Sequence, residues 1–315
     1  MTSTEQRTLG DYEVHIAWEG FASIRQISSG EIMHSRTPPM EEAKKLYVEQ
    51  SSLRERLRVT SKDDCKQTEQ LVIWDVGLGA AANAMAAIYC YEEVAGQVPV
   101  RPLRILSFEN DLDSLRLAFI RKDDFPYLKH DGPARILETG DWESKQRQGL
   151  SWGLIQGDFI ETMFKAQPPD LIYYDMFSSK TSNAVWTLET FRKLFEACEG
   201  RAVELFTYSC STANRVAQLA AGFYVARGRN AGEKIETTIV LTPAAVSAPC
   251  AIRRELLSTD WLEKWNRSRA KFPEEITADE RVSFERLIVE HPQFSLFAQG
   301  GVVSEPPSKH RRLTR

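Results

Sequence analysis

Residues 72–88, VIWDVGLGAAANAMAAI, constrain the fold of this chain more than any other stretch. Their pattern predicts a buried strand, a turn with two glycines and a helix made mostly of alanine. A strand, a glycine turn and a helix in this order are typical of nucleotide-binding α/β proteins, in which the turn holds a ligand. A dinucleotide fingerprint has a third glycine after the turn, whereas this chain has Ala81. The stretch therefore predicts an α/β fold and leaves open both the ligand and the alternative of a simple packing turn.

The chain beyond this stretch continues to alternate between strands and helices. Apolar runs predict five further strands, at residues 103–109, 150–158, 170–177, 201–209 and 235–242. Helical patterns separate several of them, at residues 110–121, 186–200 and 211–223. Strands that are apolar throughout are buried on both faces, as in parallel sheets. We therefore expect a mostly parallel, doubly wound sheet with helices on both faces.

The sequence pattern divides the chain into three regions. Residues 1–65 form a lead-in that we expect to pack on the core as a lid; it begins with short alternating strands and ends in one helix over residues 38–57. Residues 66–248 hold the α/β alternation and form the cofactor-binding domain. Residues 249–315 predict a small helical extension with a basic, disordered tail.

Composition narrows the class of protein. The formal net charge of −4 gives no general basic character for binding nucleic acid, although a local basic patch would still serve. The five cysteines are scattered without a CxxC pair, so we expect reduced thiols and no metal site. The chain has no signal sequence at its start and no apolar run of about 20 residues. We therefore expect a cytoplasmic protein that does not enter the membrane.

Acidic residues follow the first three predicted strands. Asp75 ends the first strand, Glu109 ends the second, and Asp158 follows the third. The carboxyl ends of parallel strands meet at one edge of a sheet, where ligands bind. Glu109 is placed to accept hydrogen bonds from ribose hydroxyls, and Asp158 from an adenine amino group. The alternative for each carboxylate is a helix N-cap or a solvated loop residue.

The charge around the turn favours one cofactor over another. A pyrophosphate binds a free helix N-terminus, but no positive residue lies near this turn. Asp75 would repel a pyrophosphate, whereas it would attract the ammonium and sulfonium groups of S-adenosylmethionine. The sequence therefore predicts a methyltransferase that uses S-adenosylmethionine.

A specific resemblance begins at YYDMFSSKTSNAVWT, residues 173–187. Asp175, Phe177, Trp186 and Thr187 repeat the spacing of an Asp-Gly-Phe-Ala-Pro…Met-Trp-Thr motif. With this motif the chain resembles the MnmC-type, or MnmD-type, S-adenosylmethionine-dependent tRNA methyltransferase domain. Further blocks match in the same order, at Ser35, Arg36 and Glu42, at Gly77, Gly79 and Asn83, at Ser107, Phe108 and Glu109, and at Gly232, Lys234 and Glu236. The similarity covers residues 30–245, and His34 stands where the family segment has phenylalanine.

The resemblance implies a Rossmann-like class I methyltransferase fold. It also implies transfer of a methyl group to the aminomethyl group of a wobble uridine in tRNA. The chain is too short for the FAD-dependent half of two-domain MnmC proteins and has no second glycine fingerprint, so we expect no FAD domain.

The resemblance and the strand ends together assign the site. Asp175 is the candidate catalytic residue, because a carboxylate there would orient the amine and accept its proton. We expect the cofactor to contact Asp75, Gly77, Gly79, Asn83, Glu109, Asp158, Ser35 and Glu42. We expect the substrate to contact Phe177, Trp186, Lys180 and Lys234. The alternative is that Trp186 packs on the following helix and Asp175 caps a loop.

Departures from the family pattern keep other functions open. Ala81 replaces the third glycine, Met176 replaces the glycine after Asp175, and SKTSN replaces a proline-rich loop. A related methyltransferase acting on a small-molecule or protein amine is one alternative, and a non-catalytic cofactor-binding protein is another. His34 has no nucleophile partner in the sequence, so we expect it to have a structural or lid role rather than that of a base.

Overall fold

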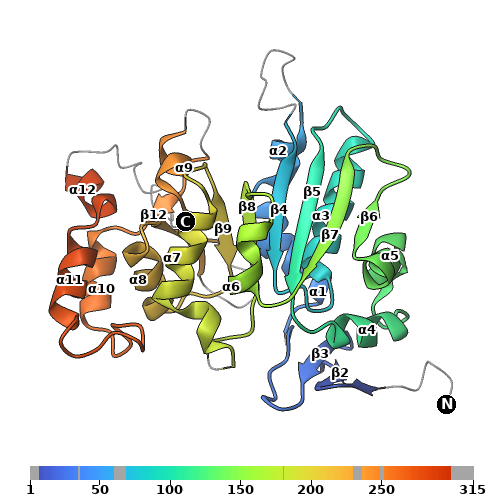
Figure 1. Ribbon diagram of the computed structural model, residues 1–315, viewed down its shortest axis with the longest axis horizontal. Coiled ribbons are helices and arrows are strands. Elements are labelled where there is room, and N and C mark those ends of the chain that lie inside the picture. Colours follow the sequence, from blue (N-terminus) through green and yellow to red (C-terminus); the bar gives the residue numbers. More distant parts are fainter. Residues whose placement is uncertain are drawn as a thin grey trace, which may run out of the picture.

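The computed structural model describes residues 7–34, 36–59, 69–179, 181–229, 236–248 and 252–298. Within these residues, nine strands form one central sheet (Figure 1). The strands are β4 (Leu71–Val76), β5 (Leu103–Glu109), β6 (Asp141–Glu143), β7 (Leu150–Gln156), β8 (Leu171–Tyr174), β9 (Glu204–Thr207), β10 (Tyr224–Gly228), β11 (Thr237–Leu241) and β12 (Glu255–Leu256). Their order across the sheet is β12-β10-β11-β9-β8-β4-β5-β7-β6.

The five strands in the middle of the sheet are parallel. β4 pairs with β5 and β8, β5 pairs with β7, and β8 pairs with β9. The chain therefore runs outward from β4 through β5 and β7, and then returns to the other side of β4 with β8. Strand order reverses at β4, which is where ligands bind in open α/β sheets. The strands β6, β10, β11 and β12 are antiparallel to their neighbours, and the expected Rossmann-like fold is confirmed.

Helices cover both faces of the sheet because the central strands are apolar on both sides. In β4, Ile73 packs in the hydrophobic cluster of one face, whereas Trp74 packs in the cluster of the other. The first face carries α3 (Ala82–Ala95), α4 (Asp113–Ile120), η4 (Pro126–Lys129), α5 (Asp131–Thr139) and α9 (Pro243–Ser247). The second face carries α6 (Phe159–Thr162), η5 (Met163–Lys165), η6 (Asn183–Trp186), α7 (Leu188–Ala197) and α8 (Thr212–Ala220).

The N-terminal lead-in starts below the carboxyl ends of the parallel strands and then runs up along the first face, where its helices pack on α3 (Figure 1). It begins with a small antiparallel sheet of β1 (Thr8–Leu9), β2 (Tyr12–Ile16) and β3 (Ala22–Gln26). It continues with α1 (Pro39–Ala43), the π-helical turn η2 (Lys44–Glu49) and α2 (Leu53–Leu57).

The expectation of one helix over residues 38–57 is wrong. The helix breaks at Ser52, whose φ of 54° is left-handed. The preceding residue, Ser51, is buried and its hydroxyl lies 3.0 Å from the hydroxyl of Tyr173 in β8. The break therefore lies next to a side-chain contact between this segment and β8.

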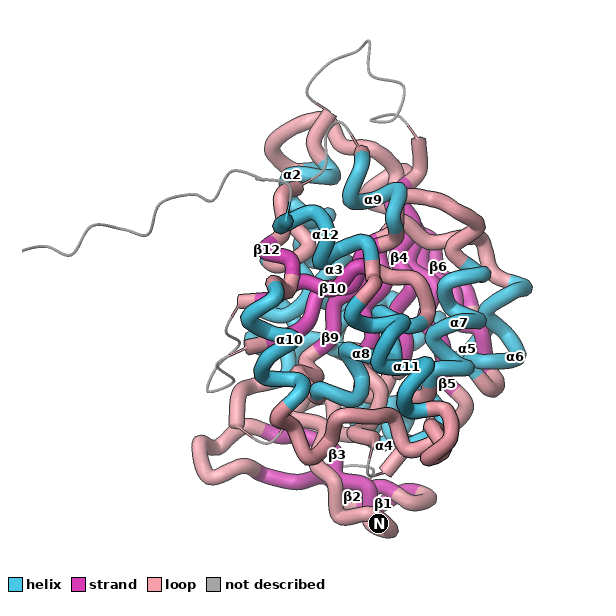
Figure 2. Tube along the Cα trace, turned by 90° about the vertical axis from the view of Figure 1, so that its left-hand side faces the viewer, coloured by secondary structure: helices cyan, strands magenta, loops and turns pink. Residues whose placement is uncertain are grey.

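The predicted helical extension is present after residue 252 and packs on the second face. It consists of α10 (Thr259–Asn266), α11 (Arg281–Val289) and α12 (Pro292–Ala298), which Figure 2 shows in front of the β10 edge. Its buried side chains join the hydrophobic cluster of α7 and α8: Trp261, Trp265, Phe284, Ile288 and Phe294. Gln293 Oε1 accepts a hydrogen bond of 2.7 Å from the Val225 amide, so α12 is tied to β10. The basic tail lies outside the described residues.

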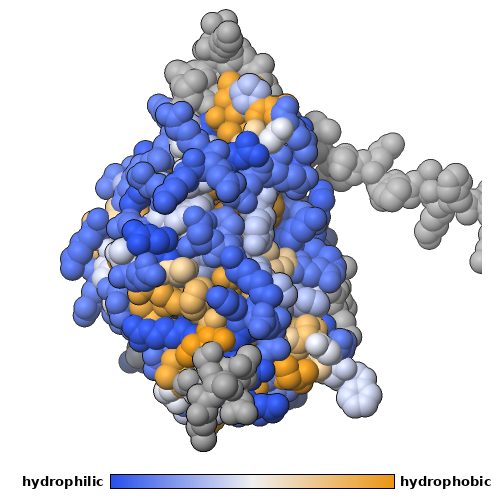
Figure 3. Space-filling view, turned by 90° about the vertical axis from the view of Figure 1, so that its right-hand side faces the viewer, coloured by the Kyte–Doolittle hydropathy of each residue, from blue (hydrophilic) through white to orange (hydrophobic). Residues whose placement is uncertain are grey.

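The opposite end of the molecule lies over β6 and α5. Figure 3 shows that this face is mostly hydrophilic, with apolar side chains in one patch near its top and in others in its lower half. Among the described residues, no helix is long and apolar enough to cross a membrane.

Candidate functional site

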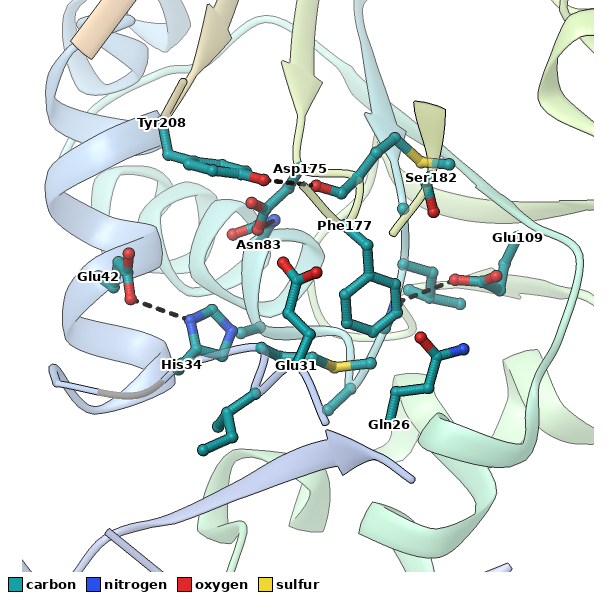
Figure 4. A pocket seen from close by; sticks show the side chains of 18 of the residues that line it. Gln26, Glu31, His34, Glu42, Asn83, Glu109, Asp175, Phe177, Ser182 and Tyr208 are labelled. Carbon is teal, nitrogen blue, oxygen red and sulfur yellow. Dashed lines mark hydrogen bonds and ion pairs between the residues drawn. The ribbon is translucent and has the colours of Figure 1, made fainter. Parts of the chain in front are cut away.

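A cavity of about 680 Å³ opens at the carboxyl ends of β4, β5 and β8. Its volume is in the range of about 300–1,000 Å³ that is usual for small-ligand sites. The floor comes from the glycine turn after β4 and from the segment after β8, and the cover comes from residues 26–42 of the lead-in (Figure 4). The cavity therefore lies at the reversal point of strand order, as the sequence predicted.

Two glycines shape the floor. Gly77 has a φ of 88°, and a Cβ there would lie 2.7 Å from the backbone oxygen of Asp175. Gly79 has a φ of 51°, and a Cβ there would lie 3.1 Å from the sulfur of Met33 in the cover. The first glycine lets the ends of β4 and β8 approach each other, and the second brings the cover close to the turn.

Ala81 is the residue that departs from the family's glycine. It is fully buried and has a left-handed φ of 65° at the N-cap of α3. A left-handed conformation costs a residue with a side chain about 1–2 kcal/mol. The turn thus keeps the backbone conformation that favours glycine, and alanine is small enough to adopt it.

Glu109 ties the end of β5 to the glycine turn and also lines the cavity. Its Oε2 accepts a hydrogen bond of 3.1 Å from the amide of Gly79, and its Oε1 accepts bonds of 2.9 and 3.2 Å from the amides of Asn110 and Asp111. Burial raises the pKa of Glu109, and these backbone bonds lower it. Its predicted contact with ribose hydroxyls stays a prediction.

Asp75 is placed differently from the sequence-based expectation. Its side chain is fully buried beneath the turn, outside the residues that line the cavity. Its Oδ2 accepts a hydrogen bond of 2.7 Å from Ser107, and the Ser107 oxygen accepts one of 2.8 Å from Trp152. Burial raises the pKa of Asp75 to about 7, which the Ser107 bond opposes and the Asp175 charge reinforces. We therefore assign Asp75 to holding the turn from below rather than to direct contact with the cofactor.

Asp175 lines the cavity directly after β8. Its Oδ2 accepts a hydrogen bond of 2.8 Å from the side-chain amide of Asn83, which lies in the first turn of α3. Burial raises the pKa of Asp175, and the nearby charge of His34 lowers it. The position suits a carboxylate that exchanges protons, since its acidity is set by groups of the same cavity.

Phe177 and Trp186, predicted together as substrate contacts, separate in the structure. Phe177 lines the cavity, whereas Trp186 is 4% exposed and lies behind it. The Trp186 ring donates a hydrogen bond of 2.8 Å to the backbone oxygen of Phe177 and packs edge-on against Tyr174, at 5.1 Å between ring centroids. The packing alternative thus describes Trp186 best, with Phe177 as the residue that it positions.

The remaining predicted residues divide into three groups. Glu42 lines the cavity, as do Gly77, Gly79, Asn83 and Glu109. Asp158 is exposed and caps α6 through a 2.7 Å hydrogen bond from the Ile160 amide, so the N-cap alternative describes its place, outside the cavity lining. Ser35, Lys180 and Lys234 lie outside the described residues.

Several residues of the site carry no signal in the sequence. Glu31 accepts hydrogen bonds from the amide and hydroxyl of Ser178, at 2.9 and 3.0 Å, and from the hydroxyl of Thr181. Tyr208, after β9, lines the cavity and donates a 3.0 Å hydrogen bond to the Met176 oxygen. These contacts link segments far apart in the chain, so no local pattern predicts them.

The charges of the cavity fit a cationic ligand. Four carboxylates line it, those of Glu31, Glu42, Glu109 and Asp175. The described residues contain no group of three or more side chains suited to hold a metal ion. When bound, S-adenosylmethionine supplies a methyl group on a positively charged sulfur, and the glycine turn and Glu109 would hold it.

The chain is similar to known methyltransferases. A family described as S-adenosyl-L-methionine-dependent methyltransferase matches residues 141–242. The solved structure of MnmC2 from Aquifex aeolicus is 20% identical, with a TM-score of 0.61, over 92% of this chain and 86% of that chain. A precorrin-6Y C5,15-methyltransferase from Geobacter metallireducens is 15% identical with a TM-score of 0.30, over 61% of this chain and 86% of that chain. No curated protein matches the sequence.

The matched family segment runs from β6 to the end of β11, so it includes β8 and Asp175 but not β4, β5 or the glycine turn. The similarity to MnmC2 extends the same fold over most of the chain. Residues 141–242 therefore match a family of S-adenosyl-L-methionine-dependent methyltransferases, and the chain as a whole shares the fold of MnmC2.

Proposed function

We propose that this protein methylates the aminomethyl nitrogen of a wobble 5-aminomethyluridine, or its 2-thio form, in tRNA. The observation that carries the proposal is the place of Asp175, in a cavity rich in carboxylates and beside Phe177. An alkylamine with an ordinary pKa of about 10.4 is a cation at neutral pH, so carboxylates attract it and one of them must take its proton. The resemblance of residues 30–245 to the MnmC-type tRNA methyltransferase domain supports this substrate class.

The residues of the site suggest how transfer is assisted. Asp175, held by Asn83, would orient the amine and remove its proton. Phe177, held by Trp186, would give a flat apolar wall against which an unstacked base packs. The protein's main task is then to align the amine with the methyl group, because alignment alone lowers the barrier of such a displacement strongly.

The decisive experiment gives the purified protein labelled S-adenosylmethionine and tRNA that carries the unmethylated aminomethyl group. We expect label on the wobble nucleoside. Asp175→Asn should lower turnover by about 10²- to 10⁴-fold and keep the affinity for S-adenosylhomocysteine, since it removes the proton acceptor and little volume.

Other outcomes would redirect the proposal. Label on a small-molecule or protein amine, with none on tRNA, would favour the alternative substrate class. No label on any amine, despite binding of S-adenosylhomocysteine, would contradict the proposed activity. We also propose that the protein works in the cytoplasm, where its tRNA substrate would be found.

A further inference from the structure

His34 and Glu42 form a pair of ionisable side chains that lines the same cavity as Asp175. The Nδ1 atom of His34 lies 3.1 Å from Oε2 of Glu42, and the His34 backbone amide donates a 3.0 Å hydrogen bond to the hydroxyl of Ser23. The imidazole is 9% exposed. Both its ring and its backbone are thus fixed by neighbours.

The orientation of the ring leaves one nitrogen for chemistry. A carboxylate beside Nδ1 favours the tautomer with a proton on that atom, so Nε2 becomes the acceptor. Figure 4 shows the ring with Glu42 on the side of Nδ1, Asp175 and Asn83 above it, and Nε2 on the cavity side. Arg36 and Thr37, which are close to His34 in the chain, also line the cavity and reach solvent.

We propose that His34, held in place by Glu42, is a second proton acceptor for the amine substrate in this cavity. The proposal rests on the function proposed above and adds to it a residue that the family pattern does not supply.

The proton step is balanced without any further reactant. One N–H bond of the ammonium group breaks and its electron pair stays on nitrogen. The proton bonds either to the carboxylate of Asp175 or to Nε2 of His34, which then releases it to water at the cavity mouth. The amine is left neutral with a lone pair, which is the form that accepts a methyl group.

The two acceptors influence each other through their charges. Asp175 is faced by His34 from the lead-in, Glu42 from α1, Tyr47 from η2 and Tyr208 after β9, and Asp75 lies beneath it. Burial raises the pKa of Asp175, the His34 charge lowers it, and the Glu42 charge raises it again. Burial and the Asp175 charge both raise the pKa of Tyr47 and of Tyr208, so neither phenol is ionised at neutral pH. Of the charges that face Asp175, that of His34 lowers its pKa, so loss of His34 is expected to raise the pKa of Asp175.

The kinetic test compares the pH dependence of kcat/KM for tRNA in wild type, His34→Phe and His34→Gln. We expect both variants to lose at least about tenfold at pH 7, and the acidic limb of the profile to move to higher pH. Binding of S-adenosylhomocysteine should change by less than about threefold, which shows that the site is still folded. His15→Phe is the matched control, because His15 lies in β2 of the small N-terminal sheet, outside the cavity lining. Wild-type rate and wild-type pH profile in His34→Phe would overturn the proposal.

A spectroscopic test separates this proposal from the choice of substrate. Carbon-13 NMR of labelled aspartate carboxyls follows the titration of Asp175, which Asp175→Asn identifies. In His34→Phe the midpoint should move to higher pH, and an unchanged midpoint would overturn the proposal even in a protein that methylates tRNA. If the wild type transfers no methyl group to tRNA, the proposed function fails, and this titration still decides whether His34 and Asp175 act on each other.

Discussion

At the scale of single residues, Gly77 shows how one absent Cβ sets the distance between two strands. The backbone oxygen of Asp175 lies 2.7 Å from the position that this Cβ would take. Because this oxygen belongs to the backbone, it cannot move aside as a flexible side chain would. The candidate proton acceptor and the glycine turn are therefore held together by backbone contact.

Gly77→Ala should destabilise the protein much more than Gly20→Ala. Both glycines have a φ of 88°, but a Cβ at Gly20 meets nothing within 4 Å. The left-handed backbone costs both variants about 1 kcal/mol, and the collision should cost Gly77→Ala about 2 kcal/mol more. Urea unfolding of the two variants measures this difference, and equal losses would show that β8 moves aside freely.

The stability of Asp75→Asn, relative to that of the wild type, should increase as the pH rises. Burial raises the pKa of Asp75 to about 7, so folded Asp75 binds a proton that the unfolded chain releases near pH 4. The wild type therefore loses stability between about pH 4 and 7, whereas an asparagine does not titrate. Relative to wild type, the free energy of unfolding of Asp75→Asn should rise by about 2 kcal/mol from pH 5 to pH 8.

Urea unfolding at both pH values checks this sign. Asp260→Asn, at an exposed position in α10, serves as the control for changing one carboxylate to an amide. A constant difference between wild type and Asp75→Asn would show that Asp75 is ionised in the folded protein throughout this range.

At the scale of elements, the strands were predictable because burial on both faces leaves a continuous apolar run. β5 coincides with the predicted residues 103–109, and β4 ends at Val76, one residue after the predicted end at Asp75. These two ends placed Gly79 and Glu109 at the cavity. The fourth predicted strand was too long, because β8 ends at Tyr174 rather than at residue 177, and Asp175 therefore follows the strand.

Elements with mixed patterns were not predictable. β10 was missed because Tyr224–Gly228 is a short run whose last two residues are Arg227 and Gly228. α5 was missed because it begins with Asp-Gly-Pro, a turn signal, and its N-cap is the unusual His130. The lead-in was predicted to pack on the core as a lid, but its detailed path over the cavity was not, since that path depends on contacts such as that of Glu31 with Ser178.

Glu31→Ala should loosen the loop after Asp175 without unfolding the protein. The half-buried Glu31 carboxylate accepts bonds from the Ser178 amide, the Ser178 hydroxyl and the Thr181 hydroxyl. Bonds to a charged group are worth about 1.5–3 kcal/mol each, so losing them should speed amide exchange at Ser178 by at least about tenfold. Hydrogen exchange measures this, and Glu19→Ala, at an exposed position in the turn between β2 and β3, is the control of equal charge. Unchanged amide exchange at Ser178 in Glu31→Ala would show that these hydrogen bonds do not hold the loop against the cover.

At the scale of the whole molecule, one buried carboxylate joins the lead-in, the sheet and the C-terminal region. Glu204 opens β9 and is 5% exposed. It pairs with Arg56 of α2, and its Oε2 accepts hydrogen bonds of 2.7 and 2.9 Å from Arg254, just before β12. Burial lowers the pKa of Arg254 and the Glu204 charge raises it, so the guanidinium depends on this partner. The three parts therefore share one electrostatic anchor as well as a hydrophobic cluster.

Glu204→Gln should accordingly weaken the whole fold rather than one part of it. The change keeps the side chain's size but leaves two arginines, one of them nearly buried, without their counter-charge. Breaking a buried ion pair in this way costs about 3 kcal/mol, whereas Glu13→Gln in the exposed pair with Arg25 should cost less than about 1 kcal/mol. Urea unfolding followed by tryptophan fluorescence and by circular dichroism should give coincident curves for Glu204→Gln, displaced together to lower urea. If the fluorescence curve alone moved, the tryptophan-containing α10 would be unfolding separately, and Glu204 would anchor the extension without supporting the sheet.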